Sequence, residues 1–152
     1  MRAPVFIKPG CSPRVTQEII RTLLEEFSLE RRCEITLTEA MLRVIYDGIY
    51  RLRKRDLWGE TKAYLLGKKV LVLIFHIKNR REFDKLVERV GSNLDPEQCA
   101  EHSLRYRFGS PTPKTLPSGK LFFYNFVHRP KTPEEARRHF AALFSKEDCI
   151  AV

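Results

Sequence analysis

The sequence has little of what marks a membrane-spanning, secreted or disordered protein. No apolar run approaches the ~20 residues of a membrane-spanning helix, and the N-terminus has no apolar signal core. Hydrophobic residues make up 43% and aromatic residues 11% of the 152 residues, which excludes a disordered chain. We therefore expect one folded domain over residues 1–152, cytoplasmic and without a membrane partner.

Cysteine is also scarce, and the cysteines that occur are far apart. No pair has the close spacing of a zinc site or of a redox CxxC motif. We interpret them as free thiols of a reduced cytosolic protein and expect no protein metal site. They are Cys11, Cys33, Cys99 and Cys149.

Acidic residues are fewer than basic ones, 19 against 28, so the net charge is +9. A positive field attracts polyanions such as nucleotides, nucleic acid or anionic lipid, but it does not choose among them. The basic cluster at residues 51–55 is more typical of a solvated helix end than of a nucleic-acid patch. Nucleic acid therefore remains a secondary candidate partner.

The apolar periodicity predicts an alternation of strands and helices. Strands are expected at 4–7, 33–37, 70–75 and 121–127, and helices at 15–27, 38–52, 58–66, 78–90 and 132–144. The helix at 38–52 should bury Met41, Ile45, Ile49 and Leu52. Residues 91–120 show no period and predict a long loop before the last strand. The order gives an α+β, ferredoxin-like βαββαβ sandwich, with helices packed around a four-stranded antiparallel sheet.

Three segments, read together, resemble the nucleoside diphosphate kinases. They are VFIKP at 5–9, SLRYRF at 103–108 and NFVH at 125–128. In that family the first strand ends in IKP, a long loop carries an IRGxF-type sequence, and the last strand ends in NxxH. The order and spacing match over about residues 4 to 145, so the chain resembles a divergent member.

The resemblance implies transfer of the γ-phosphate of a nucleoside triphosphate to a nucleoside diphosphate through a phosphohistidine. His128 would be the nucleophile, since neutral imidazole is nucleophilic near pH 7. By the same resemblance, Lys8 would neutralise charge on the phosphate, Arg105 would hold its oxygens, and Asn125 would bind the sugar hydroxyl or phosphate. Mg²⁺ would arrive with the nucleotide, and the chain would form a homo-oligomer.

The chain departs from the family pattern around the histidine. Arg129, Pro130 and Lys131 follow His128, where the family has Gly-Ser-acid. The glutamate that orients the histidine in the family aligns with His139, and Glu135 lies one helical turn earlier, where it could substitute.

Further departures concern the nucleotide itself. The second phosphate-binding arginine of the family aligns with Val87, and Arg89 would face away on a helix. The base-stacking aromatic aligns with Leu57, next to Trp58, so either is a candidate contact for the nucleotide. The loop before the last strand is about ten residues longer than the family pattern, which puts the usual hexamer in doubt. These departures keep open the alternative of a nucleotide-binding regulatory module with weak or no kinase activity. The net charge of +9 and the basic cluster at residues 51–55 keep open a nucleic-acid-binding protein.

Overall fold

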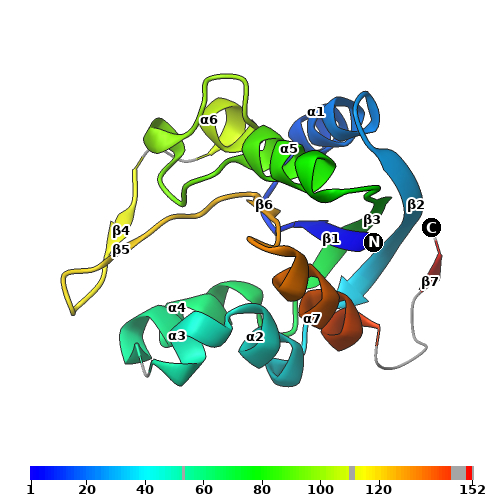
Figure 1. Ribbon diagram of the computed structural model, residues 1–152. Coiled ribbons are helices and arrows are strands. Elements are labelled where there is room, and N and C mark those ends of the chain that lie inside the picture. The colour runs from blue at the N-terminus through cyan, green and yellow to red at the C-terminus, as the bar shows by residue number, and fades with distance from the viewer. Residues whose placement is uncertain (53, 110–111, 145–149, 152) are drawn as a thin grey trace.

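The computed structural model describes residues 1–52, 54–109, 112–144 and 150–151 (Figure 1). The strands are β1 (Arg2–Ile7), β2 (Ser28–Thr36), β3 (Lys69–His76), β4 (Lys114–Thr115), β5 (Leu121–Phe122), β6 (Val127–His128) and β7 (Ile150–Ala151). The helices are α1 (Pro13–Leu24), α2 (Glu39–Ile45), α3 (Asp47–Arg51), α4 (Arg55–Leu65), α5 (Arg80–Val90), η1 (Pro96–Gln98), α6 (Leu104–Phe108) and α7 (Pro133–Leu143).

The main sheet has the strand order β6-β1-β3-β2-β7, and all of its described pairs are antiparallel. The strands β6, β1, β3 and β2 form the four-stranded antiparallel sheet of a ferredoxin-like βαββαβ fold. The predicted fold class is therefore confirmed. β7 adds a short strand at the free edge of β2.

Helices cover both faces of this sheet, with α1 and α5 on one side and α2 and α7 on the other (Figure 1). The central strand β3 serves both layers, because alternate side chains point to opposite faces. Leu73 and Phe75 pack with α1 and α5, whereas Val72 and Ile74 pack with α2 and α4. This explains why the run VLVLIF is apolar at every position.

The predicted helix over 38–52 is wrong as a single element. α2 ends at Tyr46, whose φ of −108° and ψ of 36° break the helix before α3 begins. The break turns the last part of the segment away from the core, so that Leu52 is 67% exposed instead of buried. Tyr46 itself comes to line a cavity.

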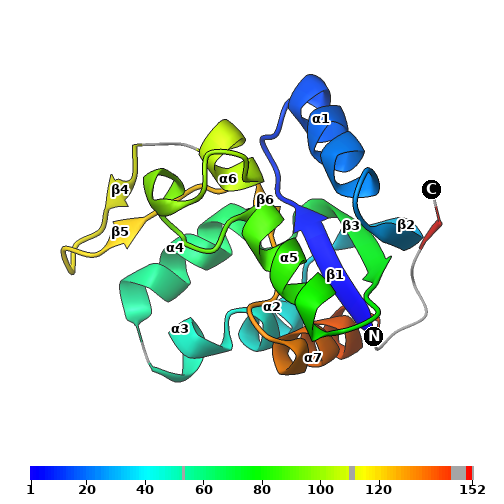
Figure 2. The same cartoon turned by 45° about the horizontal axis from the view of Figure 1, so that its top comes forward.

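The predicted strand over 121–127 is also wrong as a single element. β5 pairs with β4 in a separate hairpin, and only β6 joins the main sheet, opposite the end of β1. The hairpin folds back beside α4 (Figure 2), where Ser118 N donates to Asp56 and Lys114 pairs with Glu60. These contacts with α4 hold β5 away from the main sheet, and the expected loop 91–120 contains η1, α6 and β4.

One cysteine also differs from expectation. Cys33 is disulfide-bonded, whereas Cys11 and Cys99 carry free thiols, and Cys149 lies outside the described residues. The expectation of a free thiol is therefore wrong for Cys33, which removes the cysteine argument for a cytoplasmic location. Among the described residues, no helix combines the length and apolarity that crossing a bilayer requires.

Candidate functional site

A cavity of about 540 Å³ lies between the α2–α4 segment and the ends of β1 and β6. Five of the six residues predicted for the nucleotide site line it, although they come from distant parts of the chain: Lys8, Leu57, Arg105, Asn125 and His128. The sixth, Trp58, does not. It packs against the ring of Tyr50 at 5.2 Å between ring centres and under the ammonium of Lys62.

Lys8 is the first residue after β1. Its backbone N–H donates to the carbonyl of Phe126 at 2.7 Å, which fixes the strand end beside the segment leading to β6. Its ammonium lies 6.0 Å from the ring centre of Tyr46 and 5.8 Å from that of Tyr64. Burial and the charge of Arg105 lower the pKa of Lys8 to about 7. Lys8 belongs to no ion pair within the described part of the chain.

Arg105 lies on α6, whose first turn is capped by the Ser103 hydroxyl, and it is only 5% exposed. Its guanidinium donates to three carbonyls, those of Gly91 at 3.2 Å, Asn93 at 2.8 Å and Val127 at 3.3 Å, and to no carboxylate of the described residues. Burial and the charge of Arg129 lower its pKa to about 10.

Gly91 makes this position of Arg105 possible. Its φ is +135°, and a Cβ built there would lie 2.7 to 2.9 Å from the Cβ, Cγ and Cδ atoms of Arg105. Glycine alone combines this backbone conformation with the close approach of a neighbouring side chain. The backbone at the end of α5 and the side chain of Arg105 on α6 therefore pack in a close contact that requires glycine at position 91.

Asn125 is buried just before β6. Its amide nitrogen donates to the carbonyl of Leu94 at 2.7 Å, while its Oδ1 has no partner among the residues that the structure describes. Within the same residues, the Tyr46 hydroxyl and the Nε of Arg105 are also buried without a hydrogen-bond partner. Buried polar atoms are normally satisfied, so three unsatisfied ones on residues that line one cavity indicate a polar ligand site.

His128 ends β6 with its ring held on several sides. It stacks on Phe6 with ring centres 4.5 Å apart and lies 5.3 Å from the ring of Tyr46. Burial, followed by the charges of His139 and Lys8, lowers the pKa of His128 well below its usual value. The imidazole is therefore neutral at pH 7, which is the nucleophilic form.

The partner of this ring is another imidazole. His128 Nε2 lies 3.5 Å from His139 Nδ1, and His139 is 3% exposed on α7. Burial lowers the pKa of His139 to about 4, so both rings are neutral. Glu135, expected as a substitute for the family's glutamate, instead accepts from Lys131 N at 2.7 Å, and its own N–H donates to the hydroxyl of Thr132, the N-cap of α7.

The cavity residues that sequence reasoning missed include Arg129 and Tyr46. In the sequence, Arg129 stood out only as a departure from the family pattern. Its position in the cavity was not predictable, because the direction of its side chain depends on tertiary contacts. Val87 packs against the apolar core, and Arg89 pairs with Glu26 and donates to His102 O, so neither supplies a charge to the cavity. The described residues include no cluster of three metal-binding side chains.

The comparisons with known proteins identify the fold. Neither a protein-family model nor a curated protein sequence matches the chain. Among solved structures, the nucleoside diphosphate kinase of Aquifex aeolicus is similar with a TM-score of 0.69 and 19% identity, covering 98% of each chain. That of Borrelia burgdorferi has a TM-score of 0.72 and 15% identity, covering 100% of this chain and 91% of its own. An NDP kinase from Pyrobaculum aerophilum gives 0.69 and 17% identity, covering 98% of each chain. The chain therefore has the fold of the nucleoside diphosphate kinases.

Proposed function

We propose that the protein is a phosphotransferase that moves the γ-phosphate of a nucleoside triphosphate to a nucleoside diphosphate. One observation carries the proposal: a neutral histidine, His128, lines a cavity that Lys8 and the buried Arg105 also line, and neither cation has a carboxylate partner among the described residues. Buried cations without counter-charges are costly, and an anionic ligand would supply that charge. A nucleotide's phosphates fit both the charge and the volume.

The reaction would proceed in two steps. Nδ1 of His128 attacks the γ-phosphorus, an N–P bond forms, and the bond to the bridging oxygen breaks with its electron pair leaving on the nucleoside diphosphate. The ring proton stays on Nε2, facing Nδ1 of His139. A second nucleoside diphosphate then attacks the phosphorus with a terminal oxygen, and the N–P bond breaks. Lys8 and Arg105 would stabilise the charge on the transferred group in both steps.

A resident magnesium ion does not fit this cavity. Lys8, Arg105 and Arg129 are the cations whose charge acts on His128, whereas Mg²⁺ prefers carboxylate oxygens and substrate phosphates. The lining carboxylate of Asp47 pairs with Arg51 and Arg138, and that of Glu135 accepts from Lys131 N. We infer that any Mg²⁺ is bound to the nucleotide as it arrives.

The solved structures support this proposal by analogy. The solved structure of the Borrelia burgdorferi kinase is a transition-state mimic with vanadate and ADP bound. Its fold matches this chain over the whole length of the chain, and this likeness of fold is the only support that the comparison gives to a nucleotide site here.

Incubation with γ-labelled ATP tests the proposal. The wild type should acquire an acid-labile, base-stable label that passes to added nucleoside diphosphate, and His128→Gln should acquire none. His102→Gln is the matched control, because this exposed histidine lies outside the cavity and its loss should leave labelling unchanged. Equal labelling of the wild type and His128→Gln would reject the phosphotransferase.

One observation favours the alternative of a nucleotide-binding regulatory module. The described residues place no carboxylate in hydrogen-bond contact with His128, and a neutral imidazole stabilises the charged phosphohistidine less well than a carboxylate does. This module would bind ATP in calorimetry without labelling His128. Sedimentation of the same samples would test the expected homo-oligomer, in which the longer loop folds back on its own α4.

A further inference from the structure

Another buried arginine lines the cavity beside Lys8 and Arg105. Arg129 follows β6 directly, is 5% exposed and borders the same space as His128. Its charge contributes to lowering the pKa of both His128 and Arg105, so it lies within electrostatic reach of each. The motif comparison assigned it no role.

Arg105 and Arg129 both donate to the same carbonyl oxygen, that of Gly91. Arg129 donates to Gly91 O from Nη2 at 2.8 Å and from Nε at 3.2 Å, and Arg105 Nη1 reaches the same oxygen at 3.2 Å. A second bond from Arg129 Nη2 reaches Ser92 O at 3.2 Å. Like charges repel, so carbonyl oxygens that hold two guanidinium groups together make a rigid positive surface.

Arg129 also keeps donor capacity. A guanidinium has five N–H groups, and the Nη1 of Arg129 has only a 3.5 Å contact with the carbonyl of Pro130. No ion pair joins Arg129 to an acid in the described part of the chain. Burial lowers the pKa of Arg129, an effect that the charge of Glu135 only partly offsets, and the carboxylate of Glu135 is already bonded to Lys131 N. The remaining N–H groups thus have neither a carboxylate nor a good carbonyl partner.

We propose that Arg129 is a phosphate-binding residue of the nucleotide site, which grips terminal phosphate oxygens together with Lys8 and Arg105. It would supply the cation that the sequence lacks at Val87, from β6 instead of α5. Hydrogen bonds to the carbonyls of Gly91 and Ser92 hold the guanidinium of Arg129 in place. These two residues directly follow α5, the helix that carries Val87. This inference rests on the proposed nucleotide site but not on transfer of the phosphate.

Calorimetric titration of wild type and variants with ATP and with adenosine tests it. Arg129→Gln should weaken ATP binding about 10- to 100-fold, since charge-assisted bonds to phosphate are strong, and should leave adenosine binding unchanged. Arg137→Gln removes the same charge from an exposed position on α7 outside the cavity, so its ATP affinity should stay within about 2-fold of the wild type. Wild-type ATP affinity in a folded Arg129→Gln would overturn the proposal.

Arg129→Lys covers the case in which the glutamine variant does not fold. Lysine keeps the charge, but one ammonium cannot hold two carbonyls and a phosphate in the geometry of a planar fork. ATP affinity should fall about 5-fold or more, and wild-type affinity in this variant would again overturn the proposal. Labelling of His128 in the wild type separates the two proposals: ATP binding that depends on Arg129 without labelling would reject only the transferase.

Discussion

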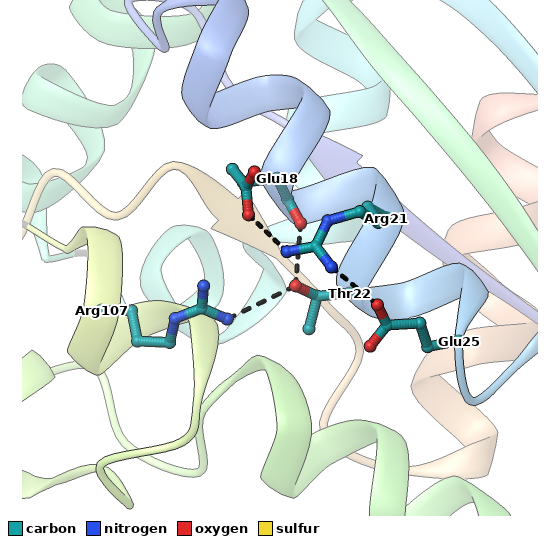
Figure 3. A network of polar contacts seen from close by, with 5 residues as sticks. All are labelled: Glu18, Arg21, Thr22, Glu25 and Arg107. Carbon is teal, nitrogen blue, oxygen red and sulfur yellow. Dashed lines mark hydrogen bonds and ion pairs between the residues drawn. The ribbon is translucent and has the colours of Figure 1, made fainter.

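Arginine occurs in two contrasting settings in this molecule. On α1, Arg21 is 61% exposed and donates to Glu18 at 2.7 Å and to Glu25 at 2.8 Å, while Arg107 reaches the Thr22 hydroxyl (Figure 3). In the cavity, Arg105 and Arg129 are buried and bonded to carbonyls alone. The first setting is a solvated charge network, and the second is a positive surface without its counter-charge.

The contrast shows which of the chain's positive charges indicate a binding site. A net charge of +9 points to no particular site, because most basic residues lie on the surface. Burial of a cation without an acid destabilises a fold, and such an arrangement is typical of a site that binds an anion. Substitutions in the cavity and on the surface should therefore differ sharply in their effects.

The largest effect is expected from Gly91→Ala. The added Cβ would clash with the Arg105 side chain, and the φ of +135° is unfavourable for alanine. We expect a loss of about 2 kcal/mol or more in the free energy of unfolding, together with at least ~10-fold weaker ATP binding. Urea unfolding and calorimetry measure the two.

Gly59→Ala is the matched control for that substitution. Gly59 lies inside α4 and outside the cavity lining, and a Cβ added there would meet no atom within 4 Å. Alanine there should keep ATP binding and raise stability by up to about 1 kcal/mol. If Gly91→Ala kept wild-type stability and ATP binding, as the control should, the close contact between Gly91 and Arg105 would not be needed for the site.

Lys8→Met should change stability and ATP binding in opposite directions. The folded pKa of Lys8, about 7, lies below its unfolded value of 10.5. The unfolded chain therefore binds more protons between these pH values, and wild-type stability should rise with pH across that window. Methionine removes the buried charge, so the variant should gain about 1 to 3 kcal/mol at pH 7 and lose that pH dependence.

The same variant should bind ATP at least ~10-fold more weakly, because the phosphate loses a cation. Thermal unfolding from pH 6 to 10 and calorimetry measure both effects. Lys69→Met, at an exposed position at the start of β3, should keep the wild-type pH dependence and affinity. A destabilised Lys8→Met with normal ATP binding would remove Lys8 from the anion site.

His139→Glu tests the electrostatics around His128. A carboxylate in place of the imidazole would face His128 Nε2 and favour the charged form of that ring. The pKa of His128, now well below its usual value, should therefore rise, whereas His139→Gln should leave it low. NMR titration of the His128 ring nitrogens measures the shift, and an unchanged pKa in His139→Glu would contradict direct contact between the rings.

Much of the fold was predictable because local signals and burial agreed. The apolar run at 70–75 predicted the strand that is found as β3, and the apolar period over 132–144 predicted α7. Thr132 caps this helix, with Glu135 N donating to its hydroxyl at 3.1 Å. The break at Tyr46 was not predictable, because the apolar period continues through it and only packing around the cavity separates α2 from α3.

The candidate site was predictable only where a motif fixed the position. Lys8, Asn125 and His128 line one cavity because the ends of β1 and β6 are neighbours in the sheet. Arg129 was not identifiable, since no spacing rule shows that a residue after a strand end turns inward onto Gly91 O. The β4–β5 hairpin was missed for a similar reason: its strands are two residues long, and contacts with α4 hold it in place.

The smallest effect is expected from Arg21→Gln, the surface counterpart of Arg129→Gln. Arg21 has two carboxylate partners, yet all three side chains are largely solvated, and water and salt screen their attraction. The melting temperature should change by about 1 °C or less, and ATP affinity should stay within about 2-fold. Thermal unfolding at low and at high salt measures the first, and calorimetry the second. A large loss of ATP affinity in Arg21→Gln would mean that the anion responds to the protein's overall positive field, and the distinction between paired surface arginines and buried cavity arginines would no longer locate the site.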